Sequence, residues 1–173
     1  MSFPSRAEYE SLVYGLLNTS PDVVASTLQL YSTSALTAIV EGNVHLRNGL
    51  ELRIVEALDF KIGHIQRYSY TVFRAGEKVR WYDSEPHSET PDLASTFPHH
   101  LHEPPDIKNN RKPAPGISFQ TPNLPTLIVD CIALGDSMIT GPSASDQETC
   151  HEPSGNRPST ESPGRGTPPG RPA

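Results

Sequence analysis

Cysteine and long apolar runs are scarce in this sequence. Its 173 residues include two cysteines. Because Cys131 ends an apolar run and Cys150 lies in a polar segment, they do not indicate the disulfide framework of a secreted protein. No segment approaches the roughly 20 apolar residues that cross a membrane. The N-terminal sequence MSFPSRAEYE also lacks the basic and apolar regions of a signal peptide, so we expect a soluble cytoplasmic protein with no membrane partner.

Basic residues are also few. The chain has 14 lysines and arginines against 20 aspartates and glutamates, and its formal net charge is -6. Proteins that coat nucleic acid without sequence preference neutralise many phosphates with basic residues. The composition excludes that mode of binding, and any contact with RNA or DNA must be local.

The composition changes near Gly135. Residues 1–135 have room for one domain of ordinary size. Residues 136–173 are rich in proline, glycine and serine and have few apolar side chains. Such a segment cannot offset its ordering entropy by burial, so we expect a disordered tail.

Helices are predicted before residue 32 and after residue 121. Ser5 and Glu8 have the spacing of a capping box, which predicts a first helix over Arg6–Leu17. Ser20, Pro21 and Asp22 are suited to start a second helix over Val23–Tyr31, although the β-branched residues there also suit a strand. The pattern near the end predicts a last helix over Thr126–Leu134, capped by Asn123 or Thr121.

Between these helices the apolar period changes to two, which predicts strands. The expected strands are 36–40, 44–46, 50–60, 64–74 and 78–82. Short connections that contain glycine or asparagine favour antiparallel hairpins. We therefore predict an α+β fold: an antiparallel meander of four or five strands, with N-terminal helices and one short C-terminal helix packed on one face.

The alternation of residues divides the predicted sheet into two faces. Leu50, Leu52 and Ile54 indicate an apolar face for the helices. Tyr68 and Tyr70 are assigned to the other face, which would be polar and aromatic. That face is either a ligand surface or a solvated surface with ordinary cross-strand pairs.

The segment Arg80–Pro115 concentrates groups that transfer protons and bind anions. It holds four of the seven histidines, and within the segment basic residues precede and follow these histidines. Its prolines predict a stiff connection, and long loops of this kind are usually functional or disordered. The candidate catalytic residues are Asp83, His87, His99, His100 and His102. The candidate substrate-binding residues are Arg80, Tyr68, Tyr70, Tyr82, Lys108 and Arg111.

The first interpretation is cleavage of RNA without a cofactor. Attack by a 2′-hydroxyl needs a base, an acid and a cation to steady the charge on phosphorus, and histidine and arginine or lysine fill these roles. His87 would pair with His99, His100 or His102, and a carboxylate such as Asp83 would orient it. The tyrosines would stack on a base.

Other interpretations remain open. Pro98 favours extended backbone, in which His100 and His102 point to one side and His99 to the other. Two same-side histidines with His87 or Asp83 would suit zinc or manganese, although their spacing matches no dedicated zinc motif. The histidines could instead bond backbone carbonyls, with Asp83 in an Asx turn. The chain could also be a non-catalytic module that binds a partner protein or a nucleotide.

Several motifs resemble those of one family. They are LRNGLELRIVEALDF, IQRYSYTVFR, WYDSEPH, FPHHLHEPPDIKNNRKPAPGISF and PNLPTLI. Together they resemble the TumE-like family of small bacterial toxin components, which was long a domain of unknown function and is rich in cyanobacterial members. The resemblance runs from about Ser5 to Ile132.

The resemblance implies the toxin of a type II toxin-antitoxin pair, neutralised by a cognate antitoxin protein. Ribonuclease activity is our inference from the histidines and from how commonly such toxins attack RNA. The family usually has lysine between the last two histidines, where this chain has Leu101. We interpret this as the loss of one cation from the site, which would reduce or abolish its activity unless Lys108 or Arg111 substitutes.

Overall fold

The computed structural model describes residues 2–87 and 89–139, and these form an α+β fold. The helices are α1 (Arg6–Tyr14), α2 (Leu16–Thr19) and α3 (Leu124–Ile139), with the 3₁₀ helix η1 (Pro91–Thr96). The strands are β1 (Val23–Ser26), β2 (Gln29–Ser32), β3 (Thr37–Leu46), β4 (Leu50–Asp59), β5 (His64–Arg74), β6 (Glu77–Asp83), β7 (His100–His102) and β8 (Arg111–Pro113).

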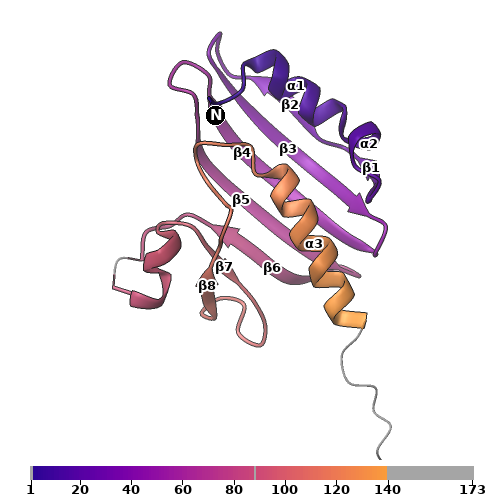
Figure 1. Cartoon of the computed structure of the whole chain (residues 1–173), viewed down its shortest axis with the longest axis vertical. Coiled ribbons are helices and arrows are strands. Elements are labelled where there is room, and N and C mark those ends of the chain that lie inside the picture. The colour runs from indigo at the N-terminus through magenta and orange to yellow at the C-terminus, as the bar shows by residue number, and fades with distance from the viewer. Residues whose placement is uncertain (1, 88, 140–173) are drawn as a thin grey trace, which may run out of the picture. The chain divides into compact units, whose positions relative to one another are not determined.

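The fold class is confirmed, but the described residues contain more strands than predicted. They form one eight-stranded antiparallel sheet in the order β1-β3-β4-β5-β6-β7-β8, in which β2 also pairs with β3. The meander β3 to β6 matches the predicted hairpins. The histidine segment was expected to be a loop, and it instead adds β7 and β8 beyond β6 (Figure 1).

The predicted second helix is wrong, because residues 23–32 form two edge strands. Val23 lies opposite Leu46, and Leu30 lies opposite Val40. The β-branched residues that lower helix propensity here suit a pleated edge. Pairing with β3 supplies backbone hydrogen bonds that a local sequence pattern cannot reveal.

The turn predicted at residues 41–43 is also wrong, because β3 continues through it. Gly42 has a φ of 138°, and a Cβ atom there would lie 2.5 Å from the Thr27 carbonyl oxygen. Glycine is therefore required by the close approach of the edge chain between β1 and β2. It does not mark a hairpin.

Both termini of the described domain pack on one face of the sheet. The capping box of Ser5 and Glu8 is present at the start of α1. The last helix is confirmed but longer than predicted, so residues 136–139 are helical and not part of a disordered tail. The rest of the predicted tail, residues 140–173, lies outside the described residues. In Figure 1, α1 and α3 lie on the same face of the sheet.

The face assignment of β4 is confirmed and that of β5 is wrong. Leu52 and Ile54 are buried as expected. Tyr68 and Tyr70 lie on this same helix-covered face. The β4–β5 pair shifts register between Ala57 and Leu58 of β4, and this interrupts the alternation along β5 so that both tyrosines face inward.

A buried carboxylate links the two ends of the domain. The hydroxyls of Tyr9 on α1 and Tyr70 on β5 each donate to Glu56, at 2.6 Å. Asn123 donates to the Tyr70 hydroxyl at 2.8 Å. Its side-chain oxygen accepts from the Ser118 amide, so Asn123 ties this network to the segment before α3. Burial raises the pKa of Glu56, although the tyrosine hydrogen bonds oppose the shift.

Replacing Glu56 with glutamine should change how stability depends on pH. The pKa of Glu56 is higher in the folded state than in the unfolded state, so the folded protein favours the protonated carboxyl. The stability that this preference contributes is fully present below the unfolded pKa and is lost as pH rises through the folded pKa. Glutamine has no such titration. The melting temperature of Glu56→Gln minus that of the wild type should therefore rise with pH above about 4.3. Thermal unfolding at several pH values, with the exposed Glu41→Gln as control, measures this, and a pH-independent difference would contradict it.

Candidate functional site

Pairing of β6 with β7 gathers the site on the sheet face opposite α1 and α3. Asp83 lies opposite His100, and Trp81 lies opposite His102. Between them, Leu101 lies opposite Tyr82 and faces the helix side. Alternation along β7 therefore places both histidines on one face, as the extended geometry predicts.

Asp83, His100 and His102 form a compact group, which we call the Asp-His cluster. One ligand atom from each residue lies within 4.8 Å of the others. His100 is 1% exposed and His102 is 2% exposed. Asp83 is half-buried, and one of its carboxylate oxygens accepts from the Glu85 amide at 2.7 Å, which forms the Asx turn considered above. Asp83 therefore forms an Asx turn and also belongs to the Asp-His cluster.

The cluster contains buried nitrogens without hydrogen-bond partners. His100 Nδ1 lies 3.1 Å from the Pro98 carbonyl oxygen. A carbonyl only accepts, so Nδ1 carries a proton, and in the neutral ring Nε2 is then the acceptor. Within the described part of the chain, His100 Nε2 and both ring nitrogens of His102 are buried and have no partner with good geometry.

A fixed positive charge, that of Arg111, lies beside His102. Arg111 lies opposite it in the β7–β8 pair. Burial lowers the pKa of His102, the charges of His100 and Arg111 lower it further, and Asp83 and the Lys108 carbonyl oppose the shift. Arg111 Nε is buried and, within residues 2–87 and 89–139, has no partner. Lys108 is exposed in the loop before β8.

His87 joins the cluster from the solvent side. Its ring centroid is 4.9 Å from that of His100. It is half-buried and lines a groove of about 320 Å³ together with Phe97. Phe97 is 50% exposed. Phe97 was not among the predicted site residues, although an aromatic residue in a polar, proline-rich segment is a recognisable signal.

His99 lies apart from the other three histidines. Its Nδ1 is 2.8 Å from the Tyr68 hydroxyl, and its ring contacts Phe119 edge-on with centroids 4.6 Å apart. Both partners belong to the helix-covered side of the sheet. Burial lowers the pKa of His99, and the neighbouring charge of His100 lowers it further. Of the predicted histidine pairs, the structure thus brings His87 together with His100.

Arg80 lies in an ion-pair network on the helix side. It donates to Asp130 of α3 at 2.5 Å and to Glu103, which also pairs with Lys112 at 2.5 Å. The Arg80 side chain is 12% exposed. Its guanidinium therefore ties α3 to β6 and the residue after β7, away from the Asp-His cluster.

The predicted stacking tyrosines are buried. Tyr70 is 0% exposed and Tyr82 is 2% exposed, and Tyr68 stacks on Tyr70 with centroids 4.5 Å apart. Tyr68 and Tyr70 are therefore closed to a base in this conformation, and Tyr82 borders only the helix-side cavity described below. On the site's own face, Trp81 stacks on His102 with centroids 4.6 Å apart, and the sequence analysis missed this residue also.

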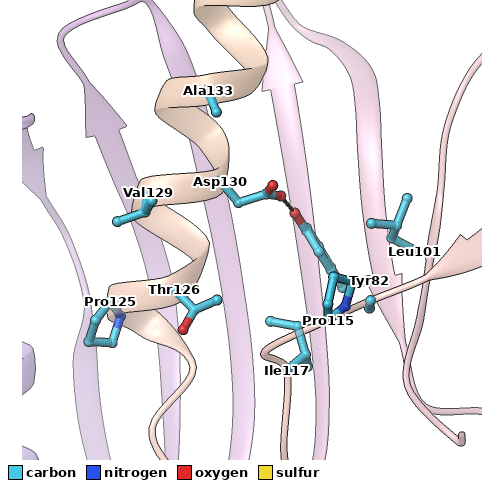
Figure 2. Close-up of a pocket in the computed structure, with 10 residues that line it drawn as sticks. Tyr82, Leu101, Pro115, Ile117, Pro125, Thr126, Val129, Asp130 and Ala133 are labelled. Atoms are coloured by element: carbon cyan, nitrogen blue, oxygen red, sulfur yellow. Dashed lines mark hydrogen bonds between the residues drawn. The ribbon is translucent and has the colours of Figure 1, made fainter. Parts of the chain in front are cut away.

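A second cavity lies on the helix side and contains no histidine. It has a volume of about 490 Å³ and is lined by α3 and the segment after β8, with Tyr82 and Leu101 (Figure 2). Tyr82 donates to Asp130 across it. The interpretation of Leu101 as a lost cation of the site is therefore wrong, because its side chain lines this cavity and points away from His100 and His102.

Comparison with known proteins identifies the family. Among the described residues, no helix is both long and apolar enough to cross a membrane. No curated protein and no solved structure matches the chain. The family model described as Toxin TumE matches residues 13–134, which is more than half of the chain. The chain therefore belongs to the TumE toxin family, and it is the toxin component of a toxin-antitoxin system with a cognate antitoxin as its partner.

Proposed function

We propose that this toxin is an endoribonuclease of a type II pair, with its active site at His87 and the Asp-His cluster. The observation that carries the proposal is the contact between His87 and His100 beside an open groove. General acid and base groups must both lie within hydrogen-bond reach of one phosphodiester. His87 is half-buried and lines the groove, and His100 lies behind it with the two ring centroids 4.9 Å apart.

The reaction follows from these groups. His87 removes the proton of the 2′-hydroxyl, and the 2′-oxygen attacks phosphorus. The bond from phosphorus to the 5′-oxygen then breaks, and a second acid group gives that oxygen a proton. The products are a 2′,3′-cyclic phosphate and a 5′-hydroxyl. We assign to Arg111, which lies opposite His102 in the β7–β8 pair, the role of steadying the charge on phosphorus.

Substrate contacts are local, as the acidic composition requires. Phe97 offers an exposed ring in the groove of His87. Aromatic rings bind single-stranded RNA by stacking on its bases. Arg111 and the exposed Lys108 supply positive charge on the β7–β8 side. These residues replace the buried tyrosines in the proposed RNA surface.

Induced expression of the full chain in a bacterial host tests the proposal. We expect growth arrest with fragmented RNA, and relief of both when the cognate antitoxin is co-expressed. The purified chain should cut an RNA oligonucleotide but not the same oligonucleotide with 2′-deoxy sugars, since the attacking hydroxyl is then absent. Growth arrest with intact RNA would remove the ribonuclease and favour the non-catalytic binding module.

A further inference from the structure

We propose that Asp83, His100 and His102 bind a divalent transition-metal ion, for which Zn²⁺ is the probe. The inference deepens the proposed function and concerns the same site, and its catalytic part rests on that function. Metal binding itself does not depend on RNA cleavage. The sequence analysis favoured a reaction without a cofactor, and three features of the structure favour an ion.

The first feature is the set of unpartnered nitrogens. Burying a polar atom without a hydrogen bond costs stability, so such atoms are rare in folded proteins. Among the described residues, His100 Nε2 and both ring nitrogens of His102 lack a hydrogen bond of good geometry, although the Lys108 carbonyl lies near enough to the His102 ring to raise its pKa. All three belong to the pair of histidines that face Asp83. A metal ion would satisfy at least one nitrogen of each ring.

The second feature is the support behind His100. A metal-binding histidine commonly donates its other ring N–H to a carbonyl or carboxylate, which fixes the tautomer and the ring orientation. His100 Nδ1 donates to the Pro98 carbonyl in this way, which leaves its buried Nε2 available as a ligand. Asp83 is held similarly, because one oxygen accepts from the Glu85 amide.

The third feature is the chemistry and spacing of the donors. Two imidazoles and one carboxylate suit zinc and its first-row neighbours, whereas calcium and magnesium prefer oxygen. Four-coordinate zinc with bonds of about 2.1 Å needs donor atoms about 3.4 Å apart. The donors lie within 4.8 Å of one another, so small side-chain rotations close the site.

Three protein ligands leave a coordination position for water or substrate. Arg111 lies beside His102, so the ion and the guanidinium would together attract a phosphate. With His100 Nε2 bound to the ion, a metal-bound water takes the role of the second acid. It gives its proton to the leaving 5′-oxygen and becomes metal-bound hydroxide, while His87 keeps its role as base.

Metal content of the untagged, purified full chain tests the inference. The chain is loaded with Zn²⁺, dialysed, and analysed by mass spectrometry for zinc per chain. Competition with a chromophoric chelator gives the affinity, and Co²⁺ in place of zinc gives visible absorption bands that report nitrogen and oxygen ligands. The variants are Asp83→Asn and His102→Gln, and the control is His45→Gln, whose side chain is 43% exposed.

We expect one zinc per chain in the wild type and in His45→Gln. Affinity should fall by at least about 100-fold in Asp83→Asn and His102→Gln. If His102→Gln does not fold, Asp83→Asn and the wild-type stoichiometry still decide the result. Zinc below one per chain in the wild type, or unchanged affinity in Asp83→Asn, would overturn the inference.

Failure of the metal site and failure of the ribonuclease give different results. RNA cleavage at an undiminished rate by metal-free protein in excess chelator would overturn the catalytic part of the inference and keep the ribonuclease, while zinc content and affinity decide metal binding itself. Stoichiometric zinc in a protein that leaves RNA intact would support the metal site and remove the ribonuclease.

Discussion

Replacing His87 with glutamine should lower the rate of RNA cleavage by about 10²- to 10⁴-fold, the usual contribution of a general acid or base. Glutamine keeps a polar side chain of similar reach but cannot take up the proton. Because His87 is half-buried at a groove, the core should remain intact. Initial rates on a fixed RNA oligonucleotide, with melting temperatures of the same preparations, measure the two effects separately.

The control for this experiment is His45→Gln, a histidine on β3 outside the site. It should cleave RNA at the wild-type rate. A loss of less than about 10-fold in His87→Gln would exclude His87 as an acid or base group. An equal loss in both variants would show that the effect is not specific to the site.

Ile54→Ala should cost about 2–5 kcal/mol of unfolding free energy, whereas Val55→Ala should change it by no more than about 0.5 kcal/mol. The residues are adjacent on β4, but Ile54 is 1% exposed and Val55 is 42% exposed. Truncation of Ile54 therefore leaves a cavity beneath the helices, and truncation of Val55 removes a side chain from an open face. Urea unfolding measures both free energies, and similar losses would contradict the two-faced sheet.

The meander was predictable because its signals are local. The strands β4, β5 and β6 follow the period-two pattern, and short turns fix their antiparallel order. The capping box fixed the start of α1 in the same way. Each of these elements is specified by residues that are close together in the sequence.

The errors arose where distant segments decide the local structure. Residues 23–32 are strands because β3 offers them an unpaired edge. Tyr70 faces inward because a register shift in the β4–β5 pair moves it there, where Glu56 and Asn123 satisfy its hydroxyl. Neither the free edge nor the shifted register can be read from these segments alone.

The sequence by itself determined the α+β class, the central meander, the family and the segment that holds the proposed site. It also placed His100 and His102 on one side of the chain, because alternation is a property of any strand. Only the tertiary structure decided which groups share the site. Pairing of β7 with β6 joins Asp83 and His87 to these histidines, and it turns His99 and Leu101 to the opposite face. The physical reason is that strand pairing sets contacts across many residues, whereas sequence patterns report only nearby ones.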